Sequence, residues 1–174
     1  AIIGNNRYEW SLAYLSVMLS NAVAVPVDKE LSIDEIKYIL EYSDCSAVIY
    51  AKCVDDKISA LQESLPNVTH YICMDELESN DDRHYSMAEL TMRGKKLFDN
   101  GDKRYLELTH DPNELKELLF TSGTTGKSKG VMLSESCLCY NVVNGQRMMW
   151  ISDTCLSVLP LHHAYESTCG LLTM

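Results

Sequence analysis

Short apolar runs alternate with segments of helical periodicity along the first half of the chain. A strand is predicted where apolar residues stand together, and a helix where they recur at three- and four-residue spacing. The predicted strands cover 1–3, 22–27, 47–50 and 69–73, and the predicted helices cover 8–20, 33–42 and 54–65. Ser32 and Glu35 form a capping box at the start of the second helix. This alternation predicts an α/β fold with a mainly parallel sheet layered with helices.

The second half of the chain is organised around one polar loop between two apolar segments. The run 118–120 predicts a buried strand, and the apolar pattern resumes at 130–134. A helix is predicted over 135–149, and another in the apolar segment 169–174. The charged stretch 75–86 is interpreted as a solvated loop rather than a site. The polar loop is therefore short and anchored at both ends.

The polar loop 121–127 consists only of Thr, Ser, Gly and Lys. Hydroxyls, unshielded backbone N–H groups and positive charge suit a polyphosphate, and Gly123, Gly126 and Gly130 permit the positive-φ conformations that turn successive N–H groups toward one anion. The tripeptide GKS does not make this a Walker A loop, because the position five before Gly126 is Thr121 rather than glycine. A flexible glycine–serine linker or a hairpin turn is the alternative.

The stretch FTSGTTGKSKGVMLS resembles the phosphate-loop signature of the adenylate-forming superfamily, which includes acyl-CoA synthetases, luciferases and the adenylation domains of peptide synthetases. Ser128 stands where most members have proline. A proline would restrain φ, so Ser128 loosens the loop without removing a phosphate donor. The stretch LSVLPLHHAYE resembles the next motif of the superfamily, an apolar strand that ends in Leu-Pro-Leu before a histidine. Its Tyr-Glu pair is most similar to long-chain fatty acyl-CoA synthetases.

The second motif implies a catalytic candidate. His163 matches the superfamily's histidine, which stands near the carboxylate and the adenylate. A hydrogen-bonded structural histidine is the alternative, and the adjacent His162 keeps that alternative open. Glu166 is interpreted as an acid at the start of a helix, where the helix dipole favours negative charge.

The first motif implies that the loop binds ATP with Mg²⁺. The lysines would supply charge, the hydroxyls would donate to the β- and γ-phosphates, and the glycines would shape the loop. The cofactor-binding candidates are Thr121, Ser122, Gly123, Thr124, Thr125, Gly126, Lys127, Lys129 and Gly130. Thr121 is also the metal candidate, because a hydroxyl is the kind of hard oxygen ligand that Mg²⁺ prefers.

The resemblance implies an ATP-dependent acid–thiol ligase, a fatty acid–CoA ligase that forms an acyl-adenylate and passes the acyl group to CoA. An acyl-AMP ligase, an amino-acid adenylation domain and a non-catalytic nucleotide-binding interaction module remain alternatives. A kinase or another NTPase would share the loop chemistry, but neither a matching metal-binding acid nor the matching spacing is found in the sequence.

Residues 1–50 resemble the early region of the superfamily, so the resemblance covers nearly the whole chain and is weakest over 75–112. It implies an incomplete N-terminal AMP-binding domain over 1–174, with strand–helix units over 1–117, a phosphate-loop hairpin over 118–134, and a helix, strand and histidine motif over 135–174. The C-terminal domain of the superfamily would be absent. We therefore expect an inactive piece that self-associates through uncovered edges and apolar faces.

Charge and composition narrow the function classes. A formal net charge of −10 argues against binding to nucleic acid or an anionic membrane surface. No apolar run has the length of a membrane span, no signal peptide is recognised within these 174 residues, and the seven cysteines show no C-x-x-C spacing. Small-molecule substrates and a cytoplasmic location are expected, with peripheral membrane association of a longer parent left open.

Overall fold

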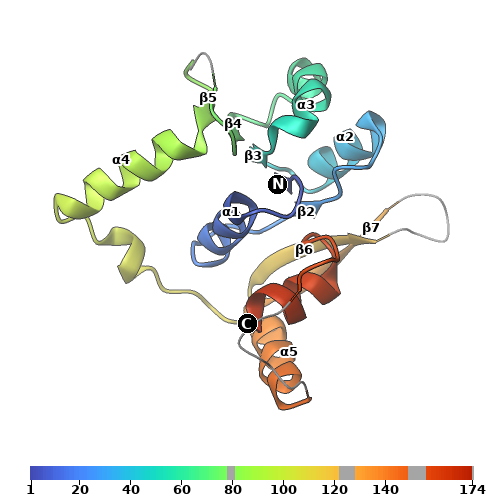
Figure 1. The fold of residues 1–174 in the computed structure, drawn as a ribbon, viewed down its shortest axis with the longest axis vertical. Helices are drawn as coiled ribbons and strands as arrows, with labels where there is room; N and C mark the ends of the chain where they lie inside the picture. Colours follow the sequence, from blue (N-terminus) through green and yellow to red (C-terminus); the bar gives the residue numbers. More distant parts are fainter. Residues whose placement is uncertain (78–80, 122–127, 149–155, 174) are drawn as a thin grey trace.

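The computed structural model describes residues 1–77, 81–121, 128–148 and 156–173, and a parallel sheet lies at its centre (Figure 1). Within these residues the strands of this sheet follow the order β2-β1-β3-β4-β5, and each is parallel to its neighbour. They are β1 (Ile2–Ile3), β2 (Pro26–Val27), β3 (Ala47–Tyr50), β4 (His70–Cys73) and β5 (His84–Ser86). The predicted α/β fold with a mainly parallel sheet is confirmed.

Helices connect the strands. They are α1 (Tyr8–Met18), α2 (Ile33–Tyr42), α3 (Asp55–Leu61), α4 (Met87–Asp99) and α5 (Glu135–Met148), with short turns η1 (Lys52–Val54), η2 (Gln62–Ser64) and η3 (Arg104–Glu107) and a π-helix, η4 (Glu166–Leu172). The predicted capping box is present, because Ser32 accepts from the Glu35 amide and the Glu35 carboxylate accepts from the Ser32 amide. Helix α4 was not predicted from the apolar pattern. None of its residues is buried, although the apolar residues Met87, Leu90, Leu97 and Phe98 recur at helical spacing.

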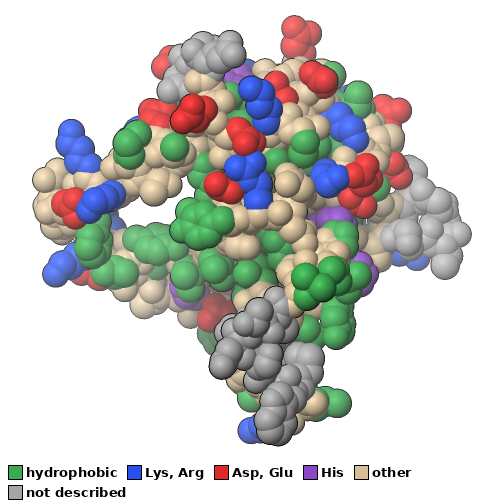
Figure 2. Space-filling view, viewed as in Figure 1, with side chains coloured by type: hydrophobic (Ala, Val, Ile, Leu, Met, Phe, Trp, Pro, Cys, Tyr) green, Lys and Arg blue, Asp and Glu red, His purple; other side chains and the backbone are tan. Residues whose placement is uncertain are grey.

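Two groups of buried side chains hold the helices on the sheet. One lies among β2, α2, β3, α3 and β4. The other is built around Trp10 and Tyr14 of α1, whose stacked rings have centroids 5.4 Å apart. Leu161, far along the chain, joins this second group. On the face drawn in Figure 2, hydrophobic side chains gather near the centre, while acidic and basic side chains are interspersed above them. Packing on α1 therefore brings the C-terminal segment beside the start of the chain.

An antiparallel hairpin docks on the edge of the parallel sheet. Its strands are β6 (Leu115–Thr121) and β7 (Lys129–Ser134). Ala24 joins the two sheets, because its N–H donates to the Lys116 carbonyl at 2.9 Å and its carbonyl accepts from the Leu118 N–H at 2.8 Å. The predicted hairpin began at 118. The strand starts earlier because its backbone pairs with Ala24, and this pairing buries the Lys116 and Glu117 side chains despite their charge. The Lys116 ammonium donates to the Ser20 carbonyl.

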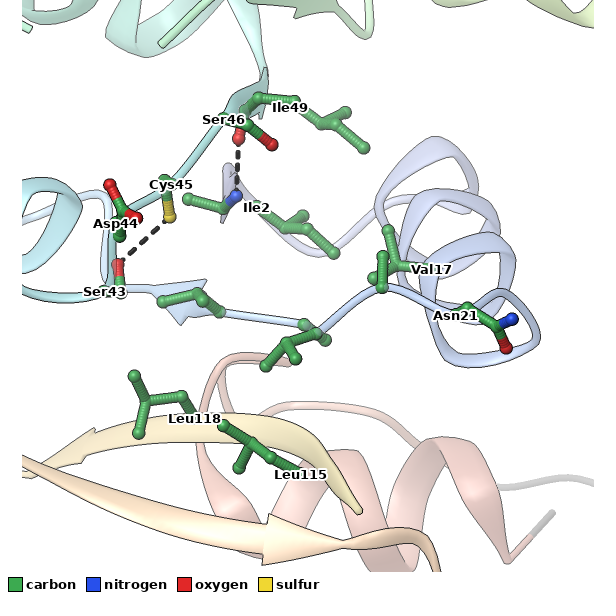
Figure 3. A pocket seen from close by; sticks show the side chains of 16 residues that line it. Ile2, Val17, Asn21, Ser43, Asp44, Cys45, Ser46, Ile49, Leu115 and Leu118 are labelled. Atoms are coloured by element: carbon green, nitrogen blue, oxygen red, sulfur yellow. Dashed lines mark hydrogen bonds between the residues drawn. The ribbon is translucent and has the colours of Figure 1, made fainter. Parts of the chain in front are cut away.

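A cavity of about 480 Å³ lies beside this junction (Figure 3). Leu115 and Leu118 line it from the hairpin, and Ile2 and Ile49 line it from the parallel sheet. None of the described loop or histidine candidates lines it. This cavity is therefore not the candidate functional site.

Glu117 is a carboxyl group with 0% exposure and no hydrogen-bond partner among the described residues. Burial raises its pKa to about 7. The Tyr14 hydroxyl partly opposes this rise, although the two groups do not meet the geometry of a hydrogen bond. Burial, followed by the charge of Glu117, also raises the pKa of Tyr14. A charged Glu117 is therefore a source of instability in the folded chain.

We expect the stability of this chain to fall as pH rises through the range in which Glu117 ionises. An unfolded glutamate titrates near pH 4.3, so between about pH 4.3 and pH 7 the folded state binds more protons than the unfolded state, and the free energy of unfolding falls by up to roughly 3 kcal/mol. The Glu117→Gln variant should lose most of this slope. Urea unfolding at several pH values would measure it, with the exposed Glu114→Gln as the control. An unchanged slope in Glu117→Gln would contradict the assignment.

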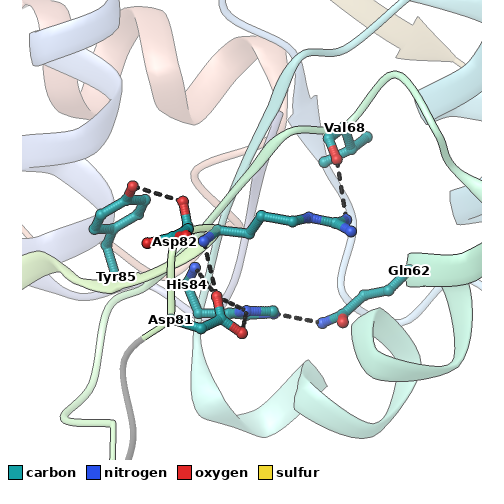
Figure 4. A network of polar contacts seen from close by, with 7 residues as sticks. Gln62, Val68, Asp81, Asp82, His84 and Tyr85 are labelled. Atoms are coloured by element: carbon teal, nitrogen blue, oxygen red, sulfur yellow. Dashed lines mark hydrogen bonds and ion pairs between the residues drawn. The ribbon is translucent and has the colours of Figure 1, made fainter.

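The charged stretch 75–86 contains a strand and a polar network (Figure 4). Asp81 Oδ1 accepts from the backbone N–H groups of Arg83 and His84, each at 2.8 Å, and these bonds help to hold the pKa of Asp81 below its usual range. The His84 ring lies between Asp81 and Gln62, with contacts of 2.8 Å and 2.9 Å. The prediction of a loop was wrong for 84–86. Polar side chains bond locally here, and the backbone is left to extend the sheet as β5.

Candidate functional site

A cavity of about 380 Å³ brings together three segments that are far apart in the sequence. Asp28 lies just after β2, Thr121 ends β6, and His163 precedes η4. The full lining is Pro26, Val27, Asp28, Leu31, Glu35, Ile39, Leu119, Phe120, Thr121, Ser128, His162, His163 and Ala164. The carboxyl ends of strands in an α/β sheet are where such proteins usually bind ligands. This cavity is the candidate functional site.

The two ends of the polar loop are held together by the hairpin. Thr121 is the last residue of β6 and pairs in register with Lys129, the first residue of β7. Both are exposed. The other candidates of the loop, Ser122, Gly123, Thr124, Thr125, Gly126 and Lys127, lie outside the described residues. The pairing of Thr121 with Lys129 therefore brings the two ends of the loop together. Thr121, at the start of the loop, and Ser128, directly after it, line the cavity.

Gly130 does not have the positive φ that the sequence analysis expected. It lies in β7 opposite Phe120, and the described glycine with positive φ is Gly101. A Cβ atom at Gly130 would stand 2.9 Å from Leu118 Cδ1. A larger residue here would therefore require the Leu118 side chain to shift, and no turn conformation is involved.

His163 joins the cavity to the helix that follows. Its Nδ1 accepts from the Tyr165 N–H at 3.3 Å, and its carbonyl accepts from the Ser167 N–H at 3.0 Å. With Nδ1 as acceptor, the neutral ring carries its proton on Nε2. The imidazole therefore has a structural bond on one nitrogen and also lines the cavity. The structural interpretation of this histidine is therefore supported by its bonds, and its catalytic role stays a prediction.

His162 and Asp28 are cavity residues that the motif analysis did not select. His162 Nε2 lies 3.6 Å from Asp28 Oδ2. Burial lowers the pKa of His162, and the Asp28 carboxylate opposes this change. Burial therefore favours the neutral form of His162. A sequence signal for Asp28 did exist, because it is the first charged residue after the apolar run 22–27.

Two predictions near the histidines have different outcomes. Residues 156–160 are not in a strand, and the exposed fractions of Leu156 and Val158 are 83% and 69%. The prediction of an apolar strand was therefore wrong. Glu166 does begin a helix, and the predicted terminal helix is present as η4. The Glu166 side chain is buried over Gly170, where a Cβ atom would meet its carboxylate at 2.5 Å.

The described residues offer hydroxyl, imidazole and carboxylate groups to the cavity. They contain no cluster of three or more His, Cys, Asp or Glu side chains that could hold a metal ion alone. Thr121 would fit Mg²⁺ as a single oxygen ligand, because this ion commonly keeps several waters and completes its shell with substrate phosphates. Among the described helices, none combines the length and apolar character needed to cross a membrane.

A profile of the AMP-binding enzyme family matches residues 1–174. A CoA ligase of Gibberella moniliformis is 31% identical over 179 residues, which cover 99% of this chain and 26% of that protein. A long-chain-fatty-acid–CoA ligase of Gallus gallus is 30% identical over 175 residues, which cover 93% of this chain and 22% of that protein. The chain therefore spans about a quarter of the length of these curated relatives.

Solved structures share the fold. The apo structure of MbtA from Mycobacterium smegmatis is similar with a TM-score of 0.80 and 23% identity, over 99% of this chain and 31% of that one. The luciferase-like enzyme of the nonluminescent mealworm Zophobas morio is similar with a TM-score of 0.81 and 16% identity, over 99% of this chain and 40% of that one. The fold, the polar loop of the hairpin and the family profile agree, and the chain belongs to the AMP-binding enzyme family.

Proposed function

We propose that the whole protein is an ATP-dependent fatty acid–CoA ligase. In this reaction a carboxylate oxygen attacks the α-phosphorus of ATP, pyrophosphate leaves, and the acyl-adenylate is then captured by the thiol of CoA. The observation that carries the proposal is the meeting of both ends of the polar loop with His163 at one cavity. The long-chain fatty acid as substrate is supported by the Tyr-Glu pair after His163 and by the curated relative from Gallus gallus, which is named for that substrate.

The reaction needs positioning and charge neutralisation more than a protein nucleophile. In the proposal, the N–H groups, hydroxyls and lysines of the loop 121–130 hold the β- and γ-phosphates. His163 presents Nε2 to the carboxylate and the adenylate. Mg²⁺, held by Thr121 and the phosphates, would neutralise the negative charge that develops on the leaving pyrophosphate. The expected cofactors and substrates are thus ATP, Mg²⁺, CoA and a fatty acid.

Carboxylate-dependent ATP–pyrophosphate exchange by the purified whole protein tests this proposal. Exchange that depends on long-chain fatty acids, followed by thioester formation with CoA, is the expected result. Exchange without thioester would instead indicate an acyl-AMP ligase, and exchange with amino acids an adenylation domain of that type. ATP binding without exchange would overturn the proposal in favour of a nucleotide-binding interaction module. The 174-residue chain alone, about a quarter of the length of its relatives, is expected to show no exchange.

We also expect the isolated chain to self-associate. Large side chains stay exposed on the hairpin and on α5, among them Met132 (70%), Tyr140 (70%) and Met148 (86%). Exposed apolar patches drive association, and a stable interface buries about 1,000 Å² or more. Light scattering at micromolar concentration should show a mass above that of one chain, 19.7 kDa. A monomer throughout the concentration series would contradict this expectation. A cytoplasmic location of the whole protein likewise remains a proposal, supported by the free thiols of the described cysteines.

A further inference from the structure

The side chain of Asn6 holds the segment that leads to the two histidines. Asn6 follows β1 and precedes α1, at the carboxyl edge of the parallel sheet. Its Nδ2 donates to the Leu159 carbonyl at 2.7 Å, and its Oδ1 accepts from the Leu161 N–H at 2.9 Å. A longer contact of 3.5 Å joins Nδ2 to Ser157 Oγ. More than 150 residues of chain separate the partners, so this is a purely tertiary contact.

These two bonds replace a strand pairing. In a parallel sheet, one residue of the neighbouring strand donates to one carbonyl and accepts from the N–H two residues further along the partner strand. The Asn6 amide does both for Leu159 and Leu161. The intervening Pro160 has no N–H to satisfy. A side-chain amide thus takes the place of a backbone partner for Leu159 and Leu161, which do not belong to a strand.

We infer that Asn6 is a positioning residue for the candidate site. It acts through His163, whose backbone it helps to hold in place. The inference rests on the proposed function. Leu161, the residue clamped by Asn6 Oδ1, is buried against α1. The His163 N–H donates to the Pro160 carbonyl at 2.9 Å, which closes a tight turn directly after the clamp. The backbone that carries His163 is thus fixed two residues away by Asn6.

Asn6 is exposed, but the residue that follows it is anchored to the sheet. The next residue, Arg7, forms ion pairs with Glu9 at 2.6 Å and with Asp75 at 2.7 Å, and Asp75 also accepts from the Lys52 N–H at 2.8 Å. This network ties the chain after β1 to the ends of β3 and β4. Asn6 therefore transfers the rigidity of the parallel sheet to the segment 159–163, so that His163 keeps its place in the cavity with Thr121.

A double-mutant cycle in the whole protein tests the inference. Asn6→Ala should lower kcat for ATP–pyrophosphate exchange by roughly 10- to 100-fold with a smaller change in KM for ATP, because misplacing a catalytic group by about 1 Å can cost that much. His163→Ala should have an effect of similar size. The double variant should be scarcely slower than either single variant, because both changes remove the same group from its position. Asn5→Ala is the matched control and should stay near the wild-type rate, because among the described residues the Asn5 side chain has just one hydrogen-bonding contact, a long one of 3.8 Å from Cys53 Sγ to Oδ1.

A merely structural role of Asn6 predicts a different result, in which the two effects multiply in the double variant. That outcome, or a wild-type rate in Asn6→Ala, would overturn the inference. If Asn6→Ala does not fold, Asn6→Asp takes its place in the cycle, because it keeps the acceptor for Leu161 and removes the donor to Leu159. Hydrogen exchange of the Leu161 amide reports on the clamp without any activity. Fast hydrogen exchange of this amide in the wild type would overturn the inference. If the amide is protected but the protein shows no ATP–pyrophosphate exchange, the proposed function has failed and the clamp has not.

Discussion

Replacing Lys127 and Lys129 together by alanine is expected to lower the rate of adenylation by the whole protein by roughly 10²- to 10³-fold or more, since the loss of even one preorganised electrostatic group costs about that much. Lys129 is exposed at the first position of β7, directly across from Thr121. The proposed function assigns both lysines to neutralising the charge that develops on pyrophosphate. The double variant should therefore lose kcat in fatty-acid-dependent ATP–pyrophosphate exchange.

The same variant should keep its stability. The exposed Lys129 side chain buries little surface, and surface substitutions usually change the free energy of unfolding by less than about 0.5 kcal/mol. Lys103→Ala removes an exposed charge outside the cavity lining and serves as the control. A double variant that adenylates fatty acid at the wild-type rate would show that these lysines have another role. A large fall in thermal stability would show that their role is structural.

Replacing Trp10 by alanine is expected to destabilise the folded chain by about 3–5 kcal/mol, the usual cost of removing a fully buried large aromatic side chain. Trp10 has 0% exposure, stacks on Tyr14 and belongs to the buried group that also holds Leu161. A domain has only about 5–15 kcal/mol of stability in total, so this loss is a large fraction of it. Urea unfolding followed by far-UV circular dichroism would measure the change without relying on tryptophan fluorescence.

Tyr8→Ala is the control for this measurement, because it removes an aromatic side chain from the same helix that is 74% exposed. Its effect should stay within about 0.5 kcal/mol. If Trp10→Ala is too unstable to purify, Trp10→Phe should show a smaller loss in the same direction. Equal effects of Trp10→Ala and Tyr8→Ala would contradict the assignment of Trp10 to the core.

Elements with strong local signals were predicted well. The capping box at Ser32 and the apolar spacing of 33–42 specify α2, and the run 47–50 specifies β3, because each signal lies within the element itself. Two elements were not predicted. Helix α4 was missed although its apolar residues recur at helical spacing, and β5 stands in a stretch whose charges suggest a loop. Its strand character comes from pairing with β4, a partner that local composition does not indicate.

The opposite error occurred at 156–160, where an apolar pattern indicated a strand and the structure has none. A strand needs a backbone partner, and here the Asn6 amide occupies the place of that partner. Glu117 is a related case. Its charge suggests exposure, yet the docking of the hairpin on Ala24 buries it completely. Both outcomes depend on which segments meet in space, which no local pattern encodes.

The sequence alone determined the class of fold and the chemistry of the loop, because apolar periodicity and a run of Thr, Ser, Gly and Lys are local properties. It also selected Thr121, Lys129 and His163 as candidates through a resemblance of motifs. Only the tertiary structure decided that Thr121 and His163 share one cavity, that Asp28 and His162 line it too, and that Asn6 holds the approach to it. The reason is geometric: the parallel sheet, the docked hairpin and the packing of Leu161 on α1 set the distances between residues that are far apart in the chain.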